Sequence, residues 1–105
     1  MTFYTVDSGY RFMMLDDIAK ELVQIDPSQF SWEERDSSFY GSYNFINEKD
    51  KRLAKIMLNN GSDERSCLHN NVHETAAIIH AYDARIQDYL LSKPDKYVFL
   101  EIDNL

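Results

Sequence analysis

The chain has 105 residues, of which 44% are hydrophobic, and its 18 acidic residues against 11 basic ones give a formal net charge of −7 at pH 7. This size and apolar content fit a single domain over residues 1–105 and exclude an intrinsically disordered chain. The acidic charge favours basic partners, so we expect no nucleic-acid ligand and no attachment to an anionic membrane.

The sequence also predicts the compartment. No apolar run reaches the ~20 residues that a membrane-spanning helix needs, and no signal-peptide pattern follows Met1. Cys67 is the only cysteine, which excludes an internal disulfide and fits a reducing environment. We therefore expect a cytoplasmic protein.

The first predicted elements are a strand and a helix. Residues 2–6 are β-branched and aromatic and precede a turn sequence at residues 7–9, which predicts a strand. Residues 10–14 fit either a returning strand or the start of the next helix. That helix is indicated by an apolar stripe at helical spacing, formed by Leu15, Ile18, Leu22 and Ile25. Pro27 ends it, because the residue before a proline is driven out of the α region.

The middle of the chain predicts one more strand and one more helix. Ser31 and Glu34 have the spacing of a capping box, but no apolar periodicity follows, so we expect at most a short helical turn. Residues 39–46 are rich in aromatic side chains and predict a strand. Residues 47–59 predict a helix that Gly61 closes. Its apolar stripe consists of Leu53, Ile56 and Met57.

The last third predicts a long helix and a final strand. The helical stripe consists of Val72, Ala76, Ile79, Ile86 and Leu90. This helix begins near Asn71 or as early as Ser62, and it ends before Pro94. Residues 97–102 alternate between apolar and polar and predict a strand. The predicted fold is α+β, with a small antiparallel or mixed sheet of three to four strands packed by about three helices, the long C-terminal helix preceding the last strand.

The histidines suggest a metal site only weakly. His69 and His73 are one helical turn apart and can share a zinc ion, whereas His80 lies about 10 Å further along the helix. Ala77 stands where the His-Glu-x-x-His pattern of zinc proteases requires its second histidine. We predict no cofactor and keep a metal-binding protein using His69 and His73 as an alternative.

No residue pattern typical of an enzyme is present. Adjacent carboxylates such as Glu33 and Glu34 point apart and do not converge on one substrate. On a helix, Cys67 and His69 would lie about 200° apart, which is wrong for a nucleophile and its base. The three glycines are isolated, so no phosphate-binding loop is indicated. We predict no catalytic residues and no enzymatic activity.

A basic cluster lies beside the aromatic segment at residues 39–45. It consists of Lys49, Lys51, Arg52 and Lys55. Cations next to aromatic rings are typical of single-strand binding, but a sequence pI near 4.8 argues against that interpretation. We therefore interpret the cluster as a solvated helix face.

The acidic first half of the chain is the predicted binding site. Residues 1–50 carry ten acids and four bases, a net charge of 4 − 10 = −6. Aromatic anchors flanked by carboxylates are typical of protein interfaces, because rings supply area and charges supply steering. The predicted partner-binding residues are Asp16, Asp17, Trp32, Glu33, Glu34, Asp36, Tyr82 and Tyr89.

These observations predict a small acidic binding protein that inhibits or neutralises a basic protein, such as a nuclease or a toxin. Immunity proteins, antitoxins and phage inhibitors act in this way, and the analogy is one of composition. A second alternative is a homo-oligomeric scaffold, such as a homodimer, in which the long helix pairs with its copy through Ile78, Tyr82 and Tyr89.

Overall fold

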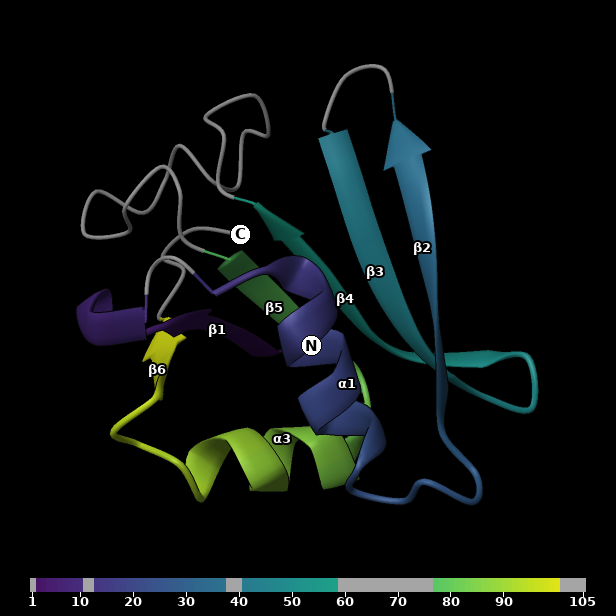
Figure 1. Cartoon of the computed structure of the whole chain (residues 1–105). Coiled ribbons are helices and arrows are strands. Elements are labelled where there is room, and N and C mark those ends of the chain that lie inside the picture. Colours follow the sequence, from purple (N-terminus) through teal and green to yellow (C-terminus); the bar gives the residue numbers. More distant parts are fainter. Residues whose placement is uncertain (1, 11–12, 38–40, 59–76, 101–105) are drawn as a thin grey trace.

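A single antiparallel sheet of six strands organises the protein (Figure 1). The computed structural model describes residues 2–10, 13–37, 41–58 and 77–100. The strands are β1 (Thr2–Val6), β2 (Ser31–Ser37), β3 (Gly41–Glu48), β4 (Lys51–Leu58), β5 (Ala77–Ala81) and β6 (Tyr97–Leu100), in the sheet order β2-β3-β4-β5-β1-β6. The helices are α1 (Leu15–Val23), α3 (Ala84–Leu91) and the short 3₁₀ helix η1 (Ser8–Tyr10).

The predicted architecture is wrong, although the fold does combine helices with a sheet. We expected three to four strands and about three helices, whereas the sheet has six strands and the described residues form two α-helices. The errors share one cause. Three segments whose sequences predict a helix or an irregular segment are strands. One is a charged edge strand and two are buried on both faces, so none shows the alternating apolar pattern by which strands are usually found.

The elements at both ends of the chain match their sequence patterns. Strand β1 has the predicted bounds, and β6 begins at the predicted Tyr97. Helix α1 begins at Leu15, buries Leu15, Ile18, Ala19 and Leu22, and ends at Val23 ahead of Pro27. These predictions are confirmed, except that α1 ends at Val23 and Ile25 of the predicted stripe lies beyond it. The patterns succeeded because a β-branched run and an amphipathic stripe act locally.

The predicted helical turn at Ser31 is wrong, because Ser31–Ser37 forms edge strand β2. Its partner is β3, with Trp32 opposite Ile46 and Glu34 opposite Asn44. Edge strands of soluble proteins often carry charged side chains, which discourage pairing with another chain. The sequence of β2, SWEERDS, therefore lacks the apolar alternation by which strands are usually found.

The predicted helix at residues 47–59 is also wrong, because this segment forms a turn and β4. Lys49 and Asp50 have φ angles of 47° and 68°, as a tight two-residue hairpin turn requires. Strand β4 buries side chains on both of its faces, and the β3–β4 register shifts at Ile46 and Asn47. Burial on both faces produced an apolar spacing that resembles a helical stripe.

The long C-terminal helix is replaced by β5 and the short helix α3. Every residue of Ala77–Ala81 is buried, because β5 lies between β4 and β1 in the middle of the sheet. A short continuous apolar run gives no periodicity that separates a strand from a helix. The predicted helix starts at Ser62 and Asn71 lie outside the described residues, as does the glycine at position 61.

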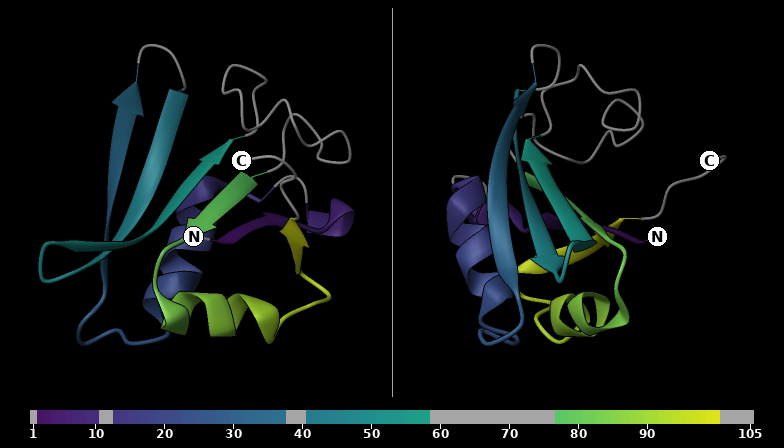
Figure 2. Two further views of the ribbon diagram at one scale, coloured as in Figure 1. Left: turned by 180° about the vertical axis from the view of Figure 1, so that it is seen from behind. Right: turned by 90° about the vertical axis from the view of Figure 1, so that its right-hand side faces the viewer.

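The two faces of the sheet differ in what covers them. The buried residues of α1 and α3 join one large core cluster with Tyr4, Ile56 and Ile79, on the side that we call the helix face. Figure 2 shows α1 lying against this side of the sheet. On the opposite side, the open face, Met57 and Ile78 form a small cluster with Tyr43 and Leu100 packed against it. Neighbouring residues of a strand therefore meet different surroundings.

Candidate functional site

Strand β2 divides the predicted site residues between the two faces. Side chains alternate along a strand, so Trp32, Glu34 and Asp36 project to the helix face. Glu33 and Arg35 project to the open face, where they lie opposite Phe45 and Tyr43 of β3. The acidic run that looks continuous in the sequence is thus split between two surfaces.

Four of the predicted acids lie on the helix side of the molecule, and we call them the acidic rim: Asp16, Asp17, Glu34 and Asp36. Asp17, Glu34 and Asp36 are exposed, and Asp16 is half-buried. Helix α1 packs against β2, β3 and β4, and its residue Glu21 faces α3 and β6. Asp16 is five residues earlier, about 140° around the helix, and so lies on the flank that faces β2. Asp17 is only about 40° around the helix from Glu21 and points away from β2.

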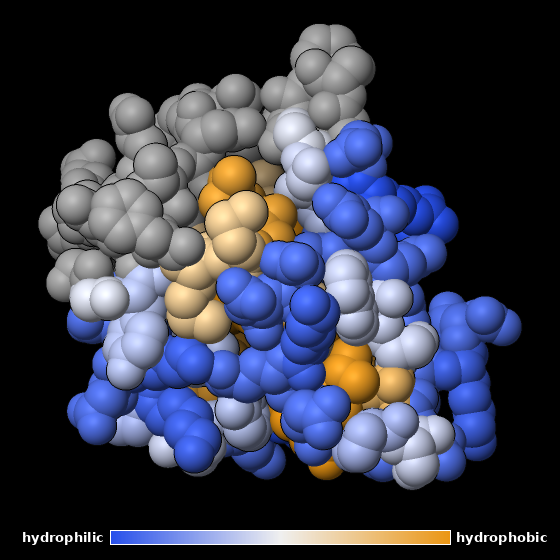
Figure 3. Space-filling view, in the orientation of Figure 1, coloured by the Kyte–Doolittle hydropathy of each residue, from blue (hydrophilic) through white to orange (hydrophobic). Residues whose placement is uncertain are grey.

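The acidic rim holds no ion pair with a described cation. Every ion pair among the described residues uses Glu21, Glu33, Glu48 or Asp83 instead. The contacts of the rim are with neutral groups: the Ser42 hydroxyl donates to Asp36 at 2.6 Å, and the Asp17 amide donates to Asp16 at 3.1 Å. Figure 3 shows hydrophilic side chains covering the region of β2 and β3 on this side. No described cation therefore pairs with a carboxylate of the rim.

Trp32 and Glu33 take different parts in this surface. Trp32 is half-buried and packs against the large core cluster, which fixes its ring beside Glu34 on the helix side. Glu33 lies on the open face, 3.5 Å from the Arg35 guanidinium and 3.7 Å from that of Arg52. The structure therefore places Trp32 with the rim and Glu33 apart from it.

Tyr82 and Tyr89 do not join the acidic rim. Tyr82 follows β5, is 43% exposed, and donates its backbone N–H to the Leu53 carbonyl at 2.9 Å. Tyr89 lies on α3 and donates its hydroxyl to Glu21 at 2.9 Å. The spacing of seven residues predicts that Tyr82 and Tyr89 share one helix face with Ile78. In the structure, Ile78 lies in β5, Tyr82 follows that strand and Tyr89 lies in α3.

Glu21 is the centre of a polar cluster that sequence reasoning missed. Its Oε2 accepts hydrogen bonds from the hydroxyls of Tyr97 at 2.6 Å and Tyr89 at 2.9 Å, and its Oε1 pairs with the Lys96 ammonium. Burial raises the pKa of Glu21, but the hydrogen bonds from Lys96 and the two tyrosines outweigh it and hold the pKa below its usual value. The cluster joins α1, α3 and the start of β6.

The two tyrosines of this cluster are held neutral. Burial and the hydrogen bond to Glu21 raise the pKa of Tyr89 to about 12. The same two causes raise the pKa of Tyr97 further, because its ring is more deeply buried. Tyr89 was predicted as a partner-binding residue, and the structure shows its hydroxyl engaged within the fold.

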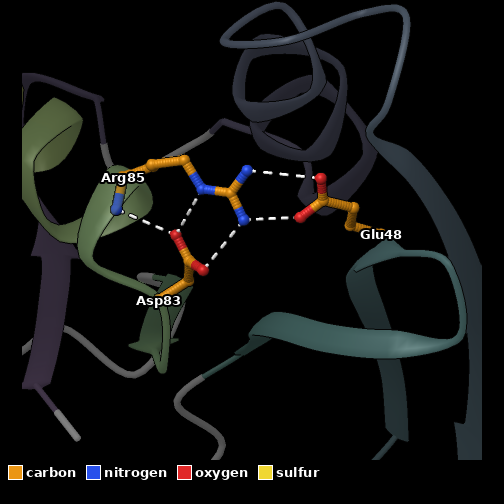
Figure 4. Close-up of polar contacts among 3 residues, drawn as sticks. All are labelled: Glu48, Asp83 and Arg85. Atoms are coloured by element: carbon orange, nitrogen blue, oxygen red, sulfur yellow. Dashed lines mark hydrogen bonds and ion pairs between the residues drawn. The ribbon is translucent and has the colours of Figure 1, made fainter.

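Arg85 forms a second cluster that the sequence did not indicate (Figure 4). Its guanidinium donates to Asp83 through Nε at 2.9 Å and through Nη2 at 3.0 Å, and to Glu48 through Nη2 at 2.5 Å. These hydrogen bonds lower the pKa of both carboxyls and raise that of Arg85. Asp83 also caps α3 by accepting from the Arg85 amide at 2.9 Å.

Neither cluster has a signal that sequence reasoning can use in full. Glu21 and Lys96 are 75 positions apart, and Arg85 and Glu48 are 37 positions apart. Only the cap is local, since an aspartate followed by Ala84 and Arg85 after an apolar run is a helix start. The sequence does not reveal this helix start, because the apolar run before Asp83 also fits a longer helix.

The metal-binding alternative concerns residues that the structure does not describe. Cys67, His69 and His73 lie in the segment 59–76, outside the described residues. Among the residues that are described, no group of three or more His, Cys, Asp or Glu side chains is arranged to hold a metal ion. Nor does the described part of the chain contain a helix long and apolar enough to span a membrane.

Comparison with protein-family models, curated proteins and solved structures finds no match to this chain. Its function therefore has to be inferred from its own residues. The feature that stands out is the contrast between carboxylates that are neutralised within the fold and those of the acidic rim.

Proposed function

We propose that the protein binds a basic protein partner through the acidic rim and thereby blocks that partner's cationic surface. The observation that carries the proposal is that none of the four rim carboxylates forms an ion pair with a described cation. By contrast, Glu21 pairs with Lys96, and each of three further acids pairs with an arginine: Glu33, Glu48 and Asp83. The rim carboxylates form no such pair with the described residues, so their charge is available to a partner.

The geometry of β2 supports this role in a second way. As an edge strand, β2 is held firmly by β3 along its whole length, so Glu34 and Asp36 stand at a fixed spacing. Trp32 lies on the same side and adds aromatic surface next to them. A backbone that is already ordered loses little conformational entropy on binding, and carboxylates beside an aromatic ring suit an arginine-rich or lysine-rich surface.

The proposed mechanism is occupation of a cationic cleft. Carboxylates placed where phosphates would otherwise lie compete with the anionic substrate of a nuclease or of a similar toxin. Because the rim charges are exposed, their contribution falls mainly on the association rate and weakens with ionic strength. Under this proposal the protein acts as an immunity protein, an antitoxin or a phage inhibitor does.

The test uses three forms of the protein as bait in a lysate of its native host at low salt. The rim variant is Glu34→Lys with Asp36→Lys. A matched control, Asp88→Lys with Asp95→Lys, makes the same change in net charge at two exposed acids of α3 and the loop after it. Retained proteins are eluted by a salt step and identified by mass spectrometry, and association rates are then measured with the purified partner.

We expect one basic protein to be retained stoichiometrically by the natural protein and by the control but not by the rim variant. With the purified partner, the rim variant should associate about tenfold more slowly at low salt, and the difference should shrink as salt rises. Equal retention by all three baits, equal losses from both variants, or no stoichiometric basic protein would each refute the proposal.

A further inference from the structure

The open face of β2, β3 and β4 carries charge opposite to that of the acidic rim. Among the described residues of these three strands, the cations Arg35, Arg52 and Lys55 lie there with the carboxylate of Glu33, a local charge of 3 − 1 = +2. Two aromatic rings of β3, Tyr43 and Phe45, lie between the outer strands. We call these three cations and two rings the cationic patch.

Two cations of the patch are held against the rings. The Arg52 guanidinium carbon lies 3.8 Å from the centroid of the Phe45 ring, and the Lys55 ammonium lies 4.5 Å from that of Tyr43. Arg35 lies opposite Tyr43 on the other side of β3, and its side chain is 56% exposed. A guanidinium stacked on an aromatic ring presents its outer plane as a surface on which a further flat group can stack.

We propose that this cationic patch binds single-stranded nucleic acid. Cations that contact phosphates, combined with flat groups that stack on bases, are the combination by which proteins hold single strands without reading their sequence. Arg35 on β2 and the cations on β4 lie about 10 Å apart, because two strand spacings separate them. A nucleic-acid strand that crosses β3 can therefore contact Arg35 on one side and the cations of β4 on the other, while one of its bases stacks on Arg52.

The net charge of −7 does not prevent this binding. Exposed charges further apart than a Debye length of about 8 Å are largely screened at physiological ionic strength. The acidic rim lies on the helix side of the sheet. A nucleic-acid strand bound to the open face therefore meets mainly the local charge of +2. The proposal concerns a different surface from the acidic rim and does not depend on the proposed function.

The test is fluorescence anisotropy with a labelled oligouridylate of 12 nucleotides, at 50 mM and 200 mM salt. Three phosphate contacts predict a slope near −2 in a plot of log affinity against log salt, so the affinity should fall about 20-fold over this range. Arg35→Glu and Arg52→Glu should each weaken binding at least tenfold at 50 mM salt. Lys20→Glu on α1 makes the same change in net charge on the helix side and should change the affinity less than twofold.

Two further measurements separate stacking from simple attraction to a polyanion. Arg52→Lys keeps the charge but removes the planar group, so it should weaken oligouridylate binding several-fold. Inorganic polyphosphate, which carries charge without bases, should compete poorly. Circular dichroism of each variant reports whether it is folded, and Arg35 is exposed enough that its variant keeps the test valid if an Arg52 variant unfolds.

The proposal fails if no saturable binding occurs at 50 mM salt, or if Arg35→Glu weakens binding no more than Lys20→Glu does. It also fails if polyphosphate competes as well as oligouridylate and folded Arg52→Lys binds like the natural protein. In that last case the patch attracts polyanions in general and does not recognise nucleic-acid bases.

Discussion

Two groups of acidic residues in this protein behave in opposite ways. Glu21, Glu48 and Asp83 each accept hydrogen bonds from a lysine or an arginine, and the pKa of each carboxyl is lowered as a result. The acids of the rim have no such described partner, and three of the four are exposed. The same residue types thus serve the fold in one region and remain available for a partner in the other.

Pairing, not composition, separates the carboxylates that join elements of the fold from those that form no ion pair with a described cation. Glu21 is partly buried and ties α1 to α3 and β6, so it cannot be exposed to a partner without loosening the packing of both helices. Carboxylates of the rim can be removed without such a cost. Each prediction below tests one side of this comparison.

The largest expected effect is that of Glu21→Ala. The substitution leaves two tyrosine hydroxyls and the Lys96 ammonium without their shared acceptor, so the free energy of unfolding should fall by about 2–3 kcal/mol. Asp17→Ala on the same helix is the control. It should change stability by less than about 0.5 kcal/mol, because the lost interaction with the helix dipole is offset by the better helix propensity of alanine. Urea unfolding measures both, and equal effects would contradict the comparison.

The next effect is a loss of stability at both ends of the pH scale. A lowered pKa in the folded state means that Glu21, Asp83 and Glu48 stabilise the protein above pH 4.5, and this contribution is lost as pH falls through their folded pKa values. Tyr89 has a raised pKa, so its contribution is present below pH 10 and is lost as pH rises towards about 12. Thermal unfolding between pH 2 and 12 tests this, and in Glu21→Ala the alkaline loss should be smaller.

The Asp83 cap should matter less than Glu21. Asp83→Ala removes the N-cap of α3 as well as an ion pair of Arg85, and we expect a loss of about 1 kcal/mol in thermal or urea unfolding. Asp83→Asn keeps a capping oxygen, so it should retain most of the stability. If asparagine proved as damaging as alanine, the ion pair and not the cap would be the main contribution.

The smallest effect should come from the acidic rim. Glu34→Gln with Asp36→Asn should change the free energy of unfolding by less than about 0.5 kcal/mol, because exposed charges without an ion pair contribute little to stability and asparagine can still accept from the Ser42 hydroxyl. A loss comparable with that of Asp83→Ala would show that the rim is structural. Urea unfolding at two salt concentrations distinguishes the two outcomes.

The candidate site was only partly predictable. Asp16, Asp17, Glu34 and Asp36 were chosen from the acidic excess, and the structure places them on one side of the protein. Glu33 lies on the other face, because side chains alternate along a strand. The sequence does not show this alternation, because the charged segment does not look like a strand. Arg85 and Glu21 were not chosen, since their partners are far away in the sequence.

The sequence by itself determined the parts of the fold whose signals are local. It placed β1, α1 and the start of β6 correctly, because β-branched runs, an amphipathic stripe and a proline act within a few residues. It also determined the acidic character of the chain.

Tertiary structure decided the rest. Only the position within the sheet made the charged segment at Ser31 an edge strand. Only pairing with neighbouring strands made Lys51–Leu58 and Ala77–Ala81 strands and not helices. Pairing between distant segments then decided which charges are neutralised. The physical reason is that burial and ion pairing depend on neighbours brought together by folding, which a local pattern does not contain.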